Sequence, residues 1–342
     1  MKLLVTGGAG FIGSNFVRYY VRTHPEHFIV NLDKLTYAGN LENLAEIDAA
    51  ANYRFVRGDV TDLDLVNQLL EPLPDAIVHF AAETHVDRSI ADGREFVQTN
   101  VLGTYTLLAA ARQRKTPRFL YVSTDEVYGS MAPGQSAYEG SMLEPNSPYA
   151  ASKASADLVA RSFWQTYRLP VITTRCSNNY GPYQFPEKLI PLMIANALEG
   201  KRLPVYGDGL NERDWIFVED HCRALDRILE SGRPGEVYNI GYGQPVTNLE
   251  IVRALLRLLD RSEDLIEFVK DRPGHDRRYA LDTAKLRSEL GWSPQMGLEE
   301  GLKSTVEWYR AHAEWMQRVR GGEYTTYYEK LYTRRADFLA GL

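Results

Sequence analysis

Four glycines mark the stretch Gly7-Gly8-Ala9-Gly10-Phe11-Ile12-Gly13, which follows the apolar run Leu3-Leu4-Val5 and opens a helical pattern that continues to about Arg22. Glycine lets the backbone turn sharply and come close to a ligand, and the unpaired N–H groups and dipole of a helix N-terminus attract a pyrophosphate. A strand, a glycine turn and a helix in this order predict the first unit of a dinucleotide-binding fold. We expect the cofactor to contact Gly7, Gly10, Phe11, Ile12 and Gly13.

An acidic residue ends the next apolar run. Asp33 follows residues 28–32 and lies twenty positions after Gly13, near the spacing at which a carboxylate meets the adenosine ribose. Such a carboxylate accepts a hydrogen bond from the 2′-hydroxyl and repels a 2′-phosphate, so the sequence favours NAD over NADP. The neighbouring Lys34 weakens this preference. The expected cofactor contacts in this segment are Asp33, Lys34, Leu35 and Thr36.

Further apolar runs alternate with helical patterns, which predicts parallel βαβ units. Strands are expected over 53–56, 76–80, 119–122 and 171–174, with helices over 93–113 and 147–167. Thr61 is a candidate cap for the helix after the third strand. Because ligands collect at the C-terminal ends of parallel strands, cofactor contacts are also expected from residues that end two of these strands; simple loop packing is the alternative. They are Asp59, Val60, Ala81 and Ala82.

The alternation breaks after residue 175. Segment 176–212 is rich in Pro, Gly, Asn and Tyr, whereas strands over 215–218 and 237–240 indicate a return to the sheet. We therefore predict an α/β fold, with a doubly wound parallel Rossmann-type sheet and a smaller, interleaved C-terminal substrate-binding lobe. The dinucleotide-binding domain is assigned to 1–175, rejoined by 214–242; the lobe is assigned to 176–213 and 243–315, with helices over 249–259 and 302–312; the tail, 316–342, has no assigned role.

Composition narrows the class of protein. Hydrophobic residues make up 44% and charged residues 25% of the chain, as in ordinary globular proteins. The net charge of −6 argues against a broad nucleic-acid surface, and no apolar run reaches the length of a membrane span or resembles a signal peptide. Cys176 and Cys222 lack paired or metal-like spacing, so we expect free buried thiols, no metal site and a cytoplasmic location.

Tyr149 and Lys153 stand four positions apart in the helix predicted over 147–167, and therefore share one face of it. An ammonium near a phenol favours the phenolate and lowers the pKa of the tyrosine. Such a tyrosine can take a proton from a substrate hydroxyl while hydride leaves for the nicotinamide. Thr124, Asp125 and Glu126 close the strand before this helix, and we expect them at the same site.

Together with four longer stretches, these motifs resemble the dTDP-glucose 4,6-dehydratase family of extended short-chain dehydrogenases/reductases, from residue 1 to about 310. The stretches are 33–40, 81–87, 123–129 and 175–186. The resemblance implies that Tyr149, with Lys153 and Thr124, supports oxidation of a hexose at carbon 4. It implies that Asp125 protonates the departing carbon-6 hydroxyl and that Glu126 takes the carbon-5 proton. A pair of solvated loop acids is the alternative for Asp125 and Glu126.

The resemblance also implies the binding residues for NAD and for dTDP-glucose. A diphosphate needs cations and N–H donors, and Arg272, His275, Arg277 and Arg278 fall close together in an otherwise acidic chain. Further cofactor contacts are expected at Thr84, Asn100 and Asn179, besides Tyr149 and Lys153. Substrate contacts are expected at His85, Thr124, Asp125, Glu126, Asn178, Lys188, Leu189, Arg213, Asn248, Arg272, His275 and Asp276, with Pro204, Val205 and Tyr206 at the base.

Three other functions share parts of this pattern. A UDP-hexose 4-epimerase needs no acid–base pair for elimination, a GDP-mannose 4,6-dehydratase prefers NADP, and a non-catalytic dinucleotide-binding protein needs no Tyr/Lys pair.

The superfamily also implies a homodimer, in which the helices over 93–113 and 147–167 pair with their mates. Tyr105, Leu108, Phe163 and Trp164 are the candidate apolar contacts, with core packing inside one subunit as the alternative.

Overall fold

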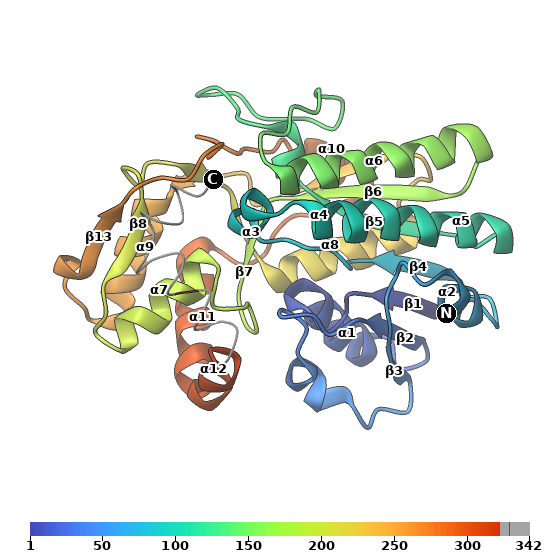
Figure 1. Ribbon diagram of the computed structural model, residues 1–342, viewed down its shortest axis with the longest axis horizontal. Coiled ribbons are helices and arrows are strands. Elements are labelled where there is room, and N and C mark those ends of the chain that lie inside the picture. Colours follow the sequence, from blue (N-terminus) through green and yellow to red (C-terminus); the bar gives the residue numbers. More distant parts are fainter. Residues whose placement is uncertain (322–327, 329–342) are drawn as a thin grey trace.

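A computed structural model of the chain describes residues 1–321 and residue 328, and within them a parallel sheet of seven strands forms the centre (Figure 1). The strand order is β11-β6-β5-β4-β1-β2-β3. The chain builds the sheet outward from β1 in one direction and then from β4 in the other, so a crevice forms at the C-terminal ends of β1 and β4. The strands are β1 (Lys2–Thr6), β2 (Phe28–Asp33), β3 (Tyr53–Arg57), β4 (Ala76–His79), β5 (Phe119–Thr124), β6 (Val171–Cys176) and β11 (Val237–Ile240).

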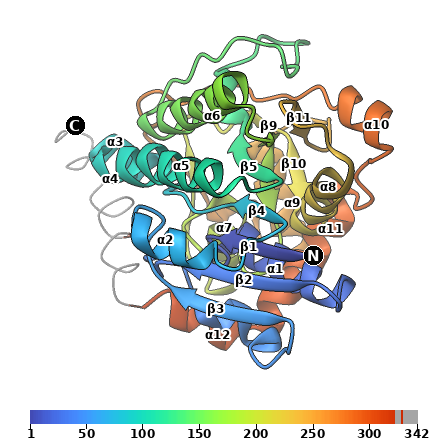
Figure 2. The ribbon, with the colours of Figure 1, turned by 90° about the vertical axis from the view of Figure 1, so that its right-hand side faces the viewer.

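Helices cover both faces of this sheet (Figure 2). Side chains alternate along β1: Leu3 and Val5 are buried in the core on one face of the sheet, whereas Leu4 is buried in the core on the other face. Strands buried on both faces read as continuous apolar runs, as they do here. One face carries α1 (Phe11–Thr23), α8 (Val218–Ser231) and α10 (Ala284–Leu290), and the other carries α2 (Leu63–Leu69), α5 (Thr104–Arg114) and α6 (Pro148–Tyr167).

The helical segment before β5 is less regular than the sequence predicts. Short helices α3 (Val86–Ala91) and α4 (Arg94–Phe96) lead into a π-helix, η2 (Val97–Gly103), before α5 begins. The prediction that Thr61 caps α2 is wrong. Asp62 is the N-cap, and its carboxylate accepts a hydrogen bond from the Leu65 N–H at 3.0 Å.

A second hydrophobic core lies beside the C-terminal ends of the sheet strands (Figure 1). Its helices are α7 (Leu189–Leu198), α9 (Asn248–Leu259), α11 (Leu298–Ala311) and α12 (Ala313–Val319). The described residues add the pairs β7 (Asn178–Tyr180) with β10 (Trp215–Phe217), β8 (Leu203–Tyr206) with β13 (Ile266–Val269) and β9 (Glu212–Arg213) with β12 (Val246–Thr247). The short helices η1 (Leu41–Ile47), η3 (Asp125–Tyr128) and η4 (Glu263–Leu265) lie in loops.

The structure differs from the expected organisation at three places. Residues 215–218 do not return to the main sheet, because β10 pairs with β7. Helix α10, assigned to the C-terminal lobe, instead packs through Leu286 and Leu290 into the core that contains α1 and α8. The first residues assigned to the tail belong to α12, where Met316 is buried in the second core; residues 322–327 and 329–342 lie outside the described part.

Two further expectations concern the cysteines and membrane-spanning helices. Cys176 and Cys222 are both free and buried, as predicted. Among the helices of the described residues, none is both long and apolar enough to cross a membrane.

Candidate active site

One cavity runs along the C-terminal ends of the sheet strands, where the doubly wound order predicts a ligand. Its lining comes from the glycine turn, from the loops after β2, β3 and β4, from the end of β5 and from α6. Most of the expected cofactor contacts meet there: Gly7, Gly10, Phe11, Ile12, Gly13, Asp33, Lys34, Thr36, Asp59, Val60, Ala81, Ala82, Thr84, Tyr149, Lys153 and Asn179.

The glycine turn leaves space for a ligand, and any larger side chain in the turn would reduce that space. Gly7 has φ of 74°, a conformation that favours glycine. A β-carbon on Gly13 would overlap the Gly7 carbonyl oxygen, so Gly13 allows α1 to start directly against the turn. Gly10 is the N-cap of α1. It leaves the N–H groups of the first helical turn open toward the cavity, an arrangement that fits a pyrophosphate.

Asp33 is held rigidly at the edge of this cavity. Its two carboxylate oxygens accept hydrogen bonds from the backbone N–H groups of Ala9 at 2.9 Å and of Leu35 at 2.8 Å. Burial raises the pKa of Asp33, while these two N–H groups oppose the rise. Lys34 forms an ion pair with Asp59 at 2.7 Å. Because Asp59 neutralises the lysine, the carboxylate of Asp33 remains the charge that a ribose would meet.

A second cavity continues from the first, since Glu126, Asn178, Asn179 and Lys188 line both. It lies between the sheet and the second core. Buried Oδ1 atoms of Asn178 and Asn248 have no hydrogen-bond partner among the described residues, as expected of groups that await a polar ligand. The expected substrate contacts that line it are His85, Glu126, Asn178, Lys188, Leu189, Pro204, Val205, Tyr206, Arg213, Asn248, Arg272 and His275.

Three cations come to this cavity from distant parts of the chain. The Lys188 ammonium donates to the Thr84 carbonyl at 2.8 Å, the Arg213 guanidinium donates to the Asp276 carbonyl at 2.9 Å, and Arg272 pairs with Asp87 at 3.3 Å. The basic run after residue 271 contributes fewer cations to this cavity than its sequence suggests. Arg277 and Arg278 instead pair with Asp208 and Glu212 on the surface side of that loop.

Tyr149 and Lys153 are both buried and lie on the cavity face of α6, as their spacing predicts. The Lys153 ammonium donates to the Val122 carbonyl at 2.7 Å, and burial lowers its pKa to about 8. The expected lowering of the Tyr149 pKa is wrong for this state of the protein. Burial raises that pKa, and the neighbouring Glu126 carboxylate raises it further, because desolvation of a phenolate outweighs a lysine that is hydrogen-bonded elsewhere.

Asp125 and Glu126 are adjacent in sequence but differ in surroundings. The pKa of Asp125 is raised well above its usual range by burial and then by the charge of Glu126, and its Oδ2 has no hydrogen-bond partner among the described residues. Burial also raises the pKa of Glu126, but Arg272, Lys188 and Arg213 oppose that rise. Burial thus favours the protonated form of both carboxyls, but these three cations oppose it at Glu126, whereas of the three Arg213 alone opposes it at Asp125.

Four expected site residues lie behind the cavity surfaces. Leu35 packs into the hydrophobic core and holds Asp33 only through its backbone. The Asn100 side chain bonds the backbone of Glu83 and the hydroxyl of Ser152, so it fixes the loop after β4 against α6. Asp276 accepts from Asn146 and Tyr279. The buried carboxyl of Asp125 lies next to Thr124, which does line the first cavity.

Sequence reasoning missed one ionisable residue at the junction of the two cavities. Glu187 lines both cavities, and burial raises its pKa to about 7. It follows an irregular segment, where no periodicity marks a buried face. Its position directly before Lys188, which we did expect at the site, was the one available signal.

Comparison with known proteins agrees with this geometry. A family model described as GDP-mannose 4,6 dehydratase matches residues 4–305. A dTDP-glucose 4,6-dehydratase of Streptomyces niveus is 52% identical to the chain over 330 residues, which cover 95% of this chain and 98% of that protein. The chain belongs to the dTDP-glucose 4,6-dehydratase family.

Solved structures agree with membership of the dTDP-glucose 4,6-dehydratase family. A member from Streptomyces venezuelae, crystallised with NAD bound, is 53% identical and has a TM-score of 0.91, with 93% of this chain and 100% of that chain covered. A UDP-glucose 4-epimerase of Thermotoga maritima is 30% identical, with a TM-score of 0.85 and coverage of 92% and 100%. The epimerases thus share the fold, but the dehydratases are much nearer in sequence.

Proposed function

We propose that the chain is an NAD-dependent dTDP-glucose 4,6-dehydratase, a hydro-lyase that converts dTDP-glucose to dTDP-4-keto-6-deoxy-glucose. Relatives about half identical over nearly the whole chain carry this activity in their names. The observation that carries the proposal is the pair formed by buried Asp125 and half-buried Glu126 at the end of β5, in unlike electrostatic surroundings beside Tyr149. An elimination needs one acid and one base, and this pair supplies both.

The cavity residues divide the work of binding. The first helical turn of α1 fits the pyrophosphate of NAD, and Asp33 fits the adenosine ribose. In the second cavity Lys188, Arg213 and Arg272 face the diphosphate of the substrate. The Tyr206 ring stands edge-on to His275, with centroids 6.2 Å apart, and offers a face to the thymine base.

When bound, NAD supplies a hydride acceptor that can give the hydride back within the same cycle. Tyr149 takes the proton of the carbon-4 hydroxyl, and the Lys153 ammonium and Thr124 hydroxyl favour the phenolate that this step requires. The resulting ketone acidifies the carbon-5 C–H bond. Glu126 then removes the carbon-5 proton, and Asp125, whose protonated form is favoured by burial, protonates the carbon-6 hydroxyl so that it leaves as water. Return of the hydride to carbon 6 and of a proton to carbon 5 completes the product.

We further propose a homodimer in the cytoplasm. Exposed apolar side chains gather on η2, α5 and α6, and free buried thiols suit a reducing compartment. The structure corrects the expected dimer contacts: Leu108 and Phe163 are core residues and Trp164 is half-buried, whereas Tyr105 is 51% exposed. We keep the division into a NAD-binding part and a nucleotide-sugar-binding lobe, with α10 moved to the former.

The test of the activity is direct. Purified protein is incubated with dTDP-glucose, and the sugar nucleotide is analysed by mass spectrometry. The dehydratase predicts a product lighter by one water. An unchanged mass with a galactose-type isomer would identify an epimerase instead, and an unchanged substrate would argue for a binding protein.

A further inference from the structure

A cluster of two imidazoles and a carboxylate lies at the edge of the sheet opposite the active site. His24, Glu26 and His27 form the turn between α1 and β2, so they adjoin the N-terminal ends of the strands. Within the described residues, two groups of three potential metal ligands lie close together, and both contain His24. The proposed chemistry at the other edge of the sheet uses neither group.

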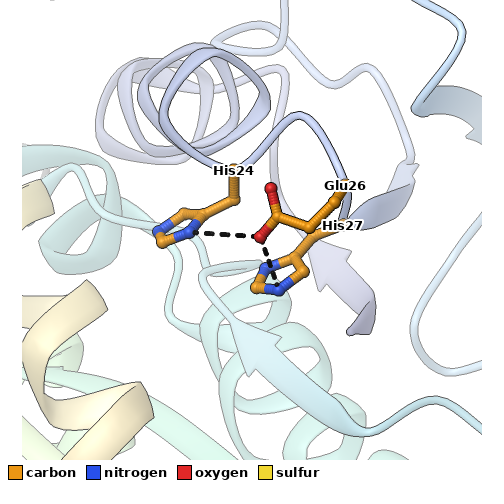
Figure 3. Close-up of side chains that lie close together, drawn as sticks. All are labelled: His24, Glu26 and His27. Atoms are coloured by element: carbon orange, nitrogen blue, oxygen red, sulfur yellow. Dashed lines mark ion pairs between the residues drawn. The ribbon is translucent and has the colours of Figure 1, made fainter.

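Figure 3 shows the Glu26 carboxylate between the two rings. Glu26 Oε1 lies 4.0 Å from His24 Nδ1 and 3.0 Å from His27 Nε2. In a tetrahedral zinc site with bonds of about 2.0–2.1 Å, ligand atoms are separated by roughly 3.3 Å. The distance from Glu26 to His27 is near this value, the distance from Glu26 to His24 is longer, and all three ligand atoms lie within 4.8 Å of one another. The two rings are stacked, with centroids 4.9 Å apart and planes 9° from parallel, so both side chains must rotate before their in-plane lone pairs can meet at one ion.

The opposite nitrogen of each ring already has a partner. His24 Nε2 is 2.9 Å from the Asp226 carboxylate on α8, which also accepts from the Tyr19 hydroxyl. His27 Nδ1 is 2.9 Å from the Tyr20 hydroxyl. A proton held on Nε2 of His24 leaves the lone pair on Nδ1, and a proton held on Nδ1 of His27 leaves it on Nε2. Such outer partners are what fixes metal-binding histidines in orientation and tautomer.

Exposure and charge also suit an ion. The two imidazoles are each 16% exposed, whereas Glu26 is 65% exposed, so an ion can enter from solvent and keep a water as its fourth ligand. Two imidazoles and one carboxylate are a donor set that zinc and similar late first-row divalent ions prefer over Mg²⁺ or Ca²⁺.

We propose that His24 Nδ1, Glu26 Oε1 and His27 Nε2 form a binding site for one zinc-like divalent ion, supported by Asp226 and Tyr20. The ion would tie the last turn of α1 to the start of β2 and, through His24, to α8. Its role is structural, since the site lies at the far edge of the sheet from the cofactor cavity.

The test titrates tag-free, chelator-treated protein with ZnCl₂ by calorimetry and counts bound zinc after dialysis. We expect one ion per chain. His24→Gln and His27→Gln should each weaken zinc binding at least tenfold, and Asp226→Asn should weaken it about 10- to 100-fold, as outer partners of metal ligands do. Zinc should raise the melting temperature of the unaltered protein and leave that of His27→Gln unchanged.

Two control variants locate the ion. Glu230→Gln alters the other group of ligands that contains His24, and His312→Gln removes a histidine that stacks on Trp308 in another part of the fold. Both should bind zinc as the unaltered protein does. All variants should keep dehydratase turnover, which confirms their fold. Absence of a saturable step, or loss of binding in Glu230→Gln but not in His27→Gln, would overturn the proposal without touching the proposed activity.

Discussion

Glu126 and Tyr149 act at different steps of the proposed reaction, so single substitutions separate those steps. Tyr149→Phe removes the group that takes the carbon-4 proton, and hydride transfer and all later steps should slow together. Glu126→Gln leaves this oxidation intact and removes the base for carbon 5, which should slow product formation by roughly 10²–10⁴. The Glu126→Gln protein should therefore accumulate NADH, measured by its near-ultraviolet absorbance.

An isotope label follows the same reaction in the unaltered enzyme. Deuterium placed at carbon 4 of the sugar should reappear at carbon 6, and solvent hydrogen should enter at carbon 5. Full turnover by Glu126→Gln, or a label that stays at carbon 4, would be incompatible with the assigned roles and would favour an epimerase.

Asp33 should set the affinity for NAD and its discrimination from NADP. Asp33→Ala leaves a buried ribose hydroxyl without a charged acceptor, at a cost of about 1.5–3 kcal/mol, or roughly a 10- to 150-fold weaker binding of NAD. The affinity for NADP should fall much less than the affinity for NAD. Fluorescence titration with each cofactor measures both effects. If the unaltered protein and Asp33→Ala bound NAD with equal affinity, the ribose would not bind at Asp33.

Helix α1 and its glycine turn allow a test of the cofactor site at the level of an element. The nearest described atom to a methyl group on Gly10 would be the Gly7 carbonyl oxygen, at 3.4 Å. Because this is an ordinary contact distance, Gly10→Ala should fold normally. The same methyl group would lie where the pyrophosphate approaches. Because each cycle returns the hydride, we expect the unaltered protein to keep NAD through purification and Gly10→Ala to lose it.

Gly13→Ala is the contrasting variant, because its methyl group would overlap the Gly7 carbonyl oxygen within the protein itself. Such overpacking typically costs about 1–3 kcal/mol, which a lower melting temperature would reveal. If Gly10→Ala kept its NAD, the glycine turn would not be the pyrophosphate site.

At the scale of the whole molecule, the apolar surface on η2, α5 and α6 should close a dimer. Its exposed members are Val97, Leu102, Tyr105, Leu158 and Tyr167. Tyr105→Glu places a charge in this surface and should shift the protein to a monomer in light scattering. Tyr138→Glu is the matched control, since Tyr138 is 59% exposed but lies in the loop between η3 and α6, away from this surface. A monomeric unaltered protein at micromolar concentration would contradict the proposal.

Much of this protein can be predicted from local sequence, because local patterns reflect local physics. The glycine turn, the alternation of strands and helices, and the i, i+4 spacing of Tyr149 and Lys153 all gave correct placements in the fold. Each depends on backbone geometry within a few residues, or on burial of a strand on both faces. The comparisons confirm the family resemblance over nearly the full chain.

Tertiary structure alone decided the features that depend on neighbours distant in sequence. The unlike surroundings of Asp125 and Glu126 arise because Lys188, Arg213 and Arg272 come from the second core, and desolvation, which the sequence does not record, sets the Tyr149 pKa. The partner of the His24 ring, Asp226, lies on α8, 202 positions along the chain. Local propensity thus fixes which elements form, whereas electrostatics and solvation depend on which side chains those elements bring together.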